Sequence, residues 1–182
     1  MMDPVKIIRK YYEPGSSAYE TLIGHGLSVS RKAAEAALNV SHLNPDMEFI
    51  REAAMLHDIG IFLTDTPELG CRGDLPYICH GYLGKALLLE MGLPRHARVC
   101  ENHVGVGITV GDIRKNGLPL PERDMIPETL EERIICYADK FFSKNPNGSS
   151  EEKPLEHIIQ GLKPYGEDKV SRFLNWVEIF GC

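Results

Sequence analysis

The stretch AAMLHDIGIFL, residues 53–63, places an imidazole and a carboxylate next to each other inside an otherwise apolar run. The helical spacing of the apolar residues around it predicts a buried helix. A buried polar group without a partner costs several kcal/mol, so His57 and Asp58 need partners within the fold. Other groups of the protein, or a bound ion, must therefore satisfy these two side chains.

The bulk composition predicts one globular domain. The chain has 182 residues, of which 43% are hydrophobic and 25% are charged. These proportions are typical of a soluble protein that buries a core of its own. We expect a single domain over residues 1–182, with a core region over about 17–144. We expect C-terminal helices at 150–182 to dock on that core.

Charge and hydropathy argue against several classes of partner. The net charge of −6 and the lack of a basic stripe argue against nucleic acid, although a few local cations would suffice for a small phosphorylated ligand. No apolar run is long enough to span a membrane. The N-terminus lacks the apolar region of a signal peptide, and the five cysteines form no C-x-x-C pair. We therefore expect a cytoplasmic protein with reduced thiols and no membrane partner.

Helical periodicity covers nearly the whole chain, and no segment has a convincing strand pattern. We therefore predict an all-α bundle of about seven to nine helices. Ser17 and Glu20 make a capping box that predicts the start of a long helix, and Thr129 and Glu132 predict another start in the same way.

Two long stretches interrupt this helical pattern. Residues 64–79 and 104–126 are punctuated by Gly and Pro, so we predict loops there. Loops of this length are more often functional than merely connecting. We expect both to form walls of a pocket and to set its specificity.

Several polar side chains fall on the inward faces of five predicted helices. They are His25, His57, Asp58, His80, His103 and Asp139. One buried histidine is usually a hydrogen-bonded core residue, but a converging set points to metal ions, because coordination offsets the desolvation of these groups. Imidazole and carboxylate together suit Fe, Mn, Zn, Co or Ni.

Asp58 is the natural bridging ligand, because a carboxylate has two oxygens whereas a neutral imidazole binds one ion. We therefore expect two divalent transition-metal ions that share this residue. The expected ligands of the first ion are His25, His57, Asp58 and Asp139. His80 and His103 are expected to complete the second site through Asp58.

The order His25, then His57-Asp58, then Asp139, with HDIG at its centre, resembles the HD superfamily of metal-dependent phosphohydrolases. The resemblance covers roughly residues 17–144. It implies a helical HD domain and a phosphohydrolase activity that depends on divalent metal ions.

The additional histidines narrow this resemblance. His80 in HGYLGK and His103 in ENHVG resemble the extra ligands of HD proteins that hold two metals, including bacterial diadenosine-tetraphosphate hydrolases. Val104 stands where the HD-GYP cyclic-di-GMP phosphodiesterases would show a second histidine, and the acidic pair of (p)ppGpp hydrolases is missing after Asp58. The cyclic-di-GMP activity is therefore disfavoured, and the identity of the substrate does not follow from the resemblance.

The resemblance implies a dinuclear phosphohydrolase that acts on a nucleotide or another small phosphorylated metabolite. The candidate catalytic residues are His57, Asp58 and Lys140, which follows Asp139 directly in YADKFFSK. Arg72 and Lys85 are the candidate substrate-binding residues, because a phosphate needs cations near the open face of the metal site.

Two other functions are consistent with the same residues. A mixed-valence diiron oxygenase that resembles myo-inositol oxygenase would use the same six ligands to activate dioxygen at iron. A non-catalytic helical domain would use the histidines for a structural metal or for core hydrogen bonds. Ligand type alone does not decide among the three.

Overall fold

The computed structural model describes residues 2–144 and 151–181, and over these residues the chain forms nine α-helices. The all-α prediction is confirmed, and the helix number lies within the predicted range. The helices are α1 (Pro4–Ile8), α2 (Ser17–Asn39), α3 (Met47–Leu56), α4 (His80–Glu90), α5 (Pro94–Asn102), α6 (Val110–Asn116), α7 (Leu130–Asp139), α8 (Leu155–Leu162) and α9 (Glu167–Phe180).

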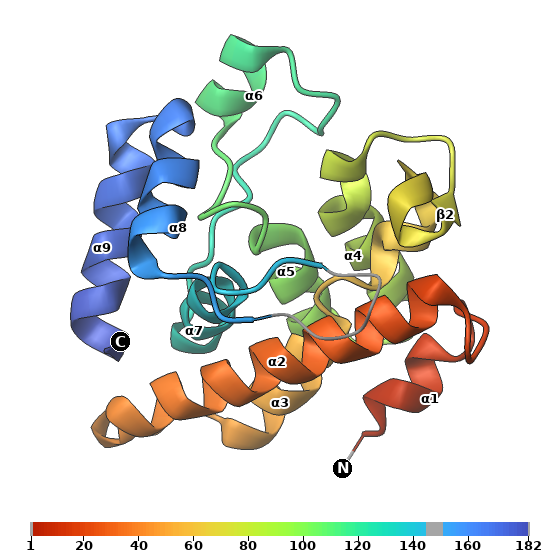
Figure 1. Ribbon diagram of the computed structural model, residues 1–182, viewed down its shortest axis with the longest axis horizontal. Coiled ribbons are helices and arrows are strands. Elements are labelled where there is room, and N and C mark those ends of the chain that lie inside the picture. Colours follow the sequence, from red (N-terminus) through yellow and green to blue (C-terminus); the bar gives the residue numbers. More distant parts are fainter. Residues whose placement is uncertain (1, 145–150, 182) are drawn as a thin grey trace.

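The long helix α2 crosses the molecule and packs against α3 and α7 (Figure 1). Its N-cap is Ser16 rather than the predicted Ser17, because the Ser16 backbone is extended and its hydroxyl accepts a hydrogen bond from Tyr19 N at 3.2 Å. The buried side of α2 carries Val29, Ala33 and His25. This packing gives α2, α3 and α7 a shared interior.

The predicted loop at 64–79 contains a small sheet, which corrects the expectation that the chain has no strands. The strands β1 (Asp65–Thr66) and β2 (Cys71–Arg72) pair antiparallel, with Asp65 opposite Arg72 and Thr66 opposite Cys71. Two residues per strand are too few to produce a readable alternation of apolar and polar residues.

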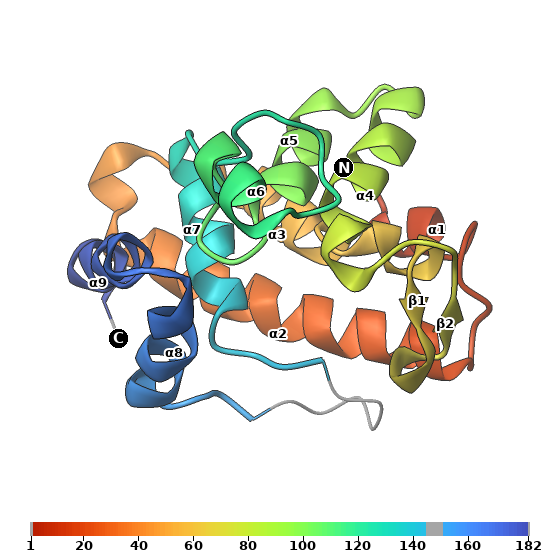
Figure 2. The same cartoon turned by 90° about the horizontal axis from the view of Figure 1, so that it is seen from above.

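The C-terminal helices share the main core. α9 contacts α2 and α7, and α8 and α9 lie together at the end of the molecule opposite α1 (Figures 1 and 2). The rings of Tyr137 on α7 and Phe173 on α9 stack with centroids 5.9 Å apart. The buried residues that α8 and α9 add to this core are Ile158, Leu162, Val170, Phe173, Trp176 and Phe180.

Two further expectations concern membrane spans and cysteines. Within the described ranges, every helix is too short or too polar to cross a membrane. Cys71, Cys79, Cys100 and Cys136 are buried free thiols, as predicted. Cys182 lies outside the described residues, as do positions 145–150.

Candidate metal centre

The structure brings the six predicted polar side chains together in the interior, although they come from five helices. They lie on α2, at the ends of α3 and α7, at the start of α4 and directly after α5. Their ligand atoms form two groups, each within 4.8 Å, and Asp58 belongs to both. The first group is His25, His57, Asp58 and Asp139, and the second is Asp58, His80 and His103.

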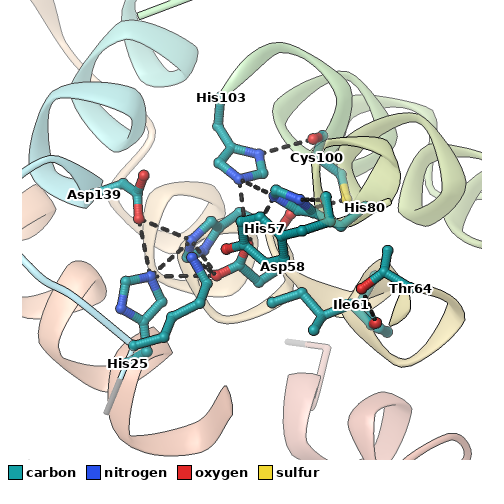
Figure 3. A network of polar contacts seen from close by, with 12 residues as sticks. His25, His57, Asp58, Ile61, Thr64, His80, Cys100, His103 and Asp139 are labelled. Atoms are coloured by element: carbon teal, nitrogen blue, oxygen red, sulfur yellow. Dashed lines mark hydrogen bonds and ion pairs between the residues drawn. The ribbon is translucent and has the colours of Figure 1, made fainter. Parts of the chain in front are cut away.

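Each carboxylate oxygen of Asp58 faces one pair of imidazoles (Figure 3). Its Oδ2 lies 3.1 Å from His57 Nε2 and 3.3 Å from His25 Nε2. Its Oδ1 lies 3.2 Å from His80 Nε2 and 3.3 Å from His103 Nε2. Asp58 thus has the position that a carboxylate bridging two cations requires.

Backbone carbonyls determine which imidazole nitrogen faces the centre. His57 Nδ1 lies 2.6 Å from Ala54 O, His80 Nδ1 lies 2.6 Å from Tyr77 O and His103 Nδ1 lies 2.8 Å from Cys100 O. A carbonyl only accepts, so each Nδ1 carries a hydrogen and, in the neutral ring, Nε2 presents its lone pair. This is the usual support of a metal-ligating histidine.

A cation fits the space between these nitrogens. His80 Nε2 and His103 Nε2 are 3.1 Å apart, and both lie beside a carboxylate oxygen. Lone pairs that face one another at this distance repel, and a metal ion between them would turn that repulsion into coordination. The residues present therefore fit a pair of metal ions.

Burial and charge give the histidines different protonation states in the metal-free protein. Burial lowers the pKa of His25 and of His103 to about 4. Burial would also lower the pKa of His57, but the charges of Asp58 and Asp139 outweigh it and raise that pKa to about 9. A metal ion bound at His57 would therefore displace a proton from that residue.

Two glycines bring the elements of the centre close together. A Cβ on Gly60 would lie 2.2 Å from His80 O, so only glycine lets the turn after Asp58 rest on the start of α4. A Cβ on Gly84 would lie 2.3 Å from Cys100 Sγ, so this glycine lets α4 pack on α5. The glycine of HDIG is thus needed to place His80 beside Asp58.

The comparisons with known proteins agree with this geometry. The sequence model of the HD domain family matches residues 22–143. The chain belongs to the HD domain family. The resemblance predicted from the HDIG stretch is therefore confirmed.

Several relatives of this HD domain are known by sequence. An uncharacterised protein of Methanocaldococcus jannaschii is 36% identical over 67% of this chain and 66% of its own length. A tRNA (cytidine(56)-2'-O)-methyltransferase of Thermoplasma volcanium is 31% identical over 91% of this chain and 45% of its own length. The corresponding methyltransferase of Picrophilus torridus is 34% identical, with 25% of its length covered. The chain thus spans less than half of either methyltransferase.

Solved structures share the fold of this HD domain. The HD domain of the L. monocytogenes phosphodiesterase PgpH has a TM-score of 0.55 at 16% identity, over 97% of this chain and 96% of that one. The same domain in complex with cyclic-di-AMP has a TM-score of 0.53 at 15% identity, over 96% and 92% of the two chains. At this identity the likeness establishes the helical arrangement.

A cleft of about 830 Å³ opens from the first ligand group of the HD domain. Asp139, Lys140 and Lys144 lie along it, and so do residues of both predicted loops. The stretch 104–126 also contains the short helix α6, whose N-cap Thr109 forms a capping box with Asp112. Tertiary contacts thus gather the two loops into the walls of one cleft.

The structure does not bring Arg72 or Lys85 to this cleft, whose lining includes neither residue. Lys85 pairs with Glu101 instead, because five residues along α4 turn its side chain about 140° away from His80. Arg72 is exposed on β2, on the face opposite the buried Cys71. Lys140, by contrast, lines the cleft, with Nζ 3.0 Å from Asp139 Oδ2.

Lys144 is a cation of the centre that the sequence analysis did not single out. Its Nζ lies 2.8 Å from Asp58 Oδ2. Burial would raise the pKa of the Asp58 carboxyl, but the charges of His57 and Lys144 hold that pKa well below its usual range. Lys144 follows the end of α7, where helical periodicity no longer indicates the direction of a side chain. Its proximity to Asp139 in YADKFFSK was the only sequence signal.

Proposed function

We propose that this HD domain is a metal-dependent phosphohydrolase that acts on a nucleotide or another small phosphorylated metabolite. The observation that carries the proposal is the position of Asp58, whose two oxygens face two separate sets of imidazoles, next to a cleft lined by Asp139, Lys140 and Lys144. A structural metal site is usually closed to solvent and binds one ion, so it requires neither an adjacent cleft nor a ligand shared between two ions.

The chain would hold two divalent transition-metal ions, chosen from Fe, Mn, Zn, Co and Ni. His25, His57, Asp58 and Asp139 would hold one ion, and Asp58, His80 and His103 would hold the other. When bound, such a pair lowers the pKa of water and neutralises phosphoryl oxygens during in-line displacement.

The side chains of the protein orient this chemistry. The carbonyls of Ala54, Tyr77 and Cys100 hold three imidazoles with Nε2 toward the centre. Lys140 and Lys144, whose side chains are both 15% exposed, would bind the non-bridging oxygens of the phosphoryl group. We assign the catalytic roles to His57, Asp58 and Lys140.

The test is an assay of the purified protein loaded in turn with Mn²⁺, Fe²⁺, Co²⁺, Ni²⁺ or Zn²⁺. The substrate panel contains nucleoside mono-, di- and triphosphates, diadenosine tetraphosphate and cyclic-di-AMP, the last because one structural neighbour was solved in complex with it. We expect release of phosphate or nucleotide with at least one ion. Asp58→Asn should lower the rate by about 100-fold or more and reduce the bound metal, because a shared ligand is lost.

Asp65→Asn is the matched control, because Asp65 is exposed on β1, and we expect it to keep both rate and metal content. No release from any substrate with any ion would contradict the proposal. Substrate-dependent uptake of dioxygen by the iron-loaded protein, without phosphate release, would favour the oxygenase instead.

A further inference from the structure

Four lysines line the cleft, although the chain as a whole carries a net charge of −6, and one of them, Lys169, is paired with Asp112. Lys140 and Lys144 follow α7, and Lys153 comes shortly before α8. Lys140 pairs with Asp139 and Lys144 pairs with Asp58. Within residues 2–144 and 151–181, no carboxylate forms an ion pair with Lys153.

The environment of Lys153 is unfavourable for a free ammonium group. The residue is half-buried, and its backbone N–H donates to Phe141 O at 2.7 Å, which holds it beside the end of α7. Burial lowers the pKa of Lys153, and the charges of Lys140 and Lys144 act in the same direction, although the charge of Asp139 partly opposes them. An anion at this end of the cleft would relieve both effects.

The rest of the cleft indicates the size of its ligand. At about 830 Å³ it is far larger than a phosphate ion. Ile108, Leu118 and Phe142 give part of its wall an apolar character, and Tyr165 on the rim is 72% exposed. Apolar and aromatic surface of this kind suits a nucleobase, whose ring packs on such side chains.

We propose that Lys153 binds a second phosphate group, so that the preferred substrate is a nucleotide with at least two linked phosphates. This inference rests on the proposed function and names the substrate class of the same site. Lys140 and Lys144 lie beside the proposed metal ligands and bind the phosphate group that reacts. Lys153 binds the phosphate group linked to it. Lys153 lies outside residues 22–143, so the C-terminal segment supplies this specificity.

The experiment measures binding of two probes by calorimetry to the protein with its retained metal and no free metal. The probes are inorganic phosphate and imidodiphosphate, a diphosphate with a nitrogen bridge. We expect imidodiphosphate to bind at least tenfold more tightly than phosphate. Lys153→Met should lower the affinity for imidodiphosphate by about ten- to a hundredfold, the value of one charge-assisted contact, and leave the phosphate affinity within about twofold.

Lys163→Met is the matched control, because Lys163 is an exposed lysine of the same segment that does not line the cleft. We expect it to leave both affinities unchanged, and Lys153→Arg to restore most of the imidodiphosphate affinity. Thermal unfolding checks that each variant is folded, and Lys153→Gln replaces the Met variant if that one is not.

Equal losses for both probes, or no loss for either, would overturn the inference. The proposed function has a separate readout, because hydrolysis of the substrate panel does not enter the binding measurement. A protein that hydrolyses nucleotides but binds both probes alike refutes only the role of Lys153. A protein that distinguishes the probes but hydrolyses nothing refutes only the hydrolase.

Discussion

At the scale of single residues, the centre depends on a carboxylate and an imidazole that are neighbours in sequence. His57 ends α3 as its C-cap, and Asp58 follows in a non-helical conformation with φ −106° and ψ 9°. Because the helix stops between them, the two side chains converge on one point instead of diverging by about 100°. This local change of backbone is what makes an adjacent pair useful to the same metal centre.

The pKa values at the centre predict how the stability of the metal-free protein depends on pH. The pKa of His57 is raised from 6.5 to about 9. The stabilisation that protonated His57 gives the folded protein is therefore complete below pH 6.5 and is lost as pH rises toward 9. His25 and His103 have pKa values of about 4 in the folded protein. As pH falls from 6.5 toward 4, the unfolded chain binds protons at these residues and the folded protein does not, so the free energy of unfolding decreases. The free energy of unfolding should therefore peak near pH 6.5.

Urea unfolding in the presence of a chelator, measured from pH 5 to pH 9, checks this prediction. We expect a loss on the order of 2–3 kcal/mol between pH 6.5 and pH 9. His57→Gln should flatten that side of the curve, whereas His42→Gln should not, because His42 is exposed. A wild-type curve that stays level over this range would show that His57 is neutral.

At the scale of elements, close contacts of glycine determine which helices can meet. The turn after Asp58 lies on the first residue of α4 because Gly60 has no side chain, and α4 lies on α5 because of Gly84. His80 and His103, the two proposed ligands, are brought beside Asp58 by this packing. The same glycine that follows the His-Asp pair in sequence thus connects the pair to the second ligand group.

Gly60→Ala should separate α4 from the His-Asp pair, since the new Cβ would lie 2.2 Å from His80 O and 2.5 Å from Gly84 N. We expect a loss of about 1–3 kcal/mol of stability and fewer metal ions retained per chain. Chemical unfolding and metal analysis measure the two effects.

Gly161→Ala is the control, because a Cβ at that position of α8 meets no atom within 4 Å. It should be neutral or stabilising by up to about 1 kcal/mol, since alanine favours the helix. A Gly60 variant that keeps its full metal content would show that α4 accommodates the methyl group without moving His80.

Element boundaries show where sequence patterns were imprecise. Ser16 caps α2 although Ser17 also has a suitable hydroxyl, and only the extended backbone of Ser16 distinguishes the two. Thr129 caps α7 as predicted, but Glu132 accepts from Glu128 N instead of completing the box. Capping positions that differ by one residue are therefore decided by the path of the incoming chain.

At the scale of the whole molecule, the C-terminal helices contribute both core and cleft. Phe173 on α9 is fully buried, with its ring centroid 5.9 Å from that of Tyr137 and 6.0 Å from that of Phe141. Its two partners stand on either side of Asp139 in sequence. The packing of α9 thus supports the segment that carries one of the proposed ligands and Lys140.

Phe173→Ala should lower the free energy of unfolding by about 3–5 kcal/mol, because it leaves a large cavity in the core. Leu174→Ala is the neighbouring control, since Leu174 is 38% exposed, and should cost about 1 kcal/mol or less. Urea unfolding followed by circular dichroism and by fluorescence of Trp176 measures both.

The same wild-type experiment tests the prediction of a single domain. Trp176 is the only tryptophan and lies on α9, whereas circular dichroism reports on all helices. Coincident transitions are expected if the C-terminal helices and the rest unfold as one unit. Separate transitions would show that residues after 150 form a unit of their own.

The sequence by itself determined the helical class, the six polar groups of the interior and the HD resemblance. Each of these depends on residue type and on periodicity along one helix, which are local properties. His25, His80 and Asp139 were readable because they lie on helical faces where side-chain direction follows from spacing, and His57 and His103 cap the helices α3 and α5. Asp58 was found only as the neighbour of His57 in HDIG.

Only the tertiary structure decided which cations reach the cleft. Lys85 and Arg72 have suitable charges but face other parts of the molecule, while Lys144 and Lys153 follow helix ends or precede helix starts, where spacing does not indicate direction. Lys153 lines the cleft because α9 packs on α2 and α7, and α8 packs on α9, through contacts between residues far apart in sequence. Side-chain direction outside regular helices is determined by such long-range packing, and no local pattern in the sequence records it.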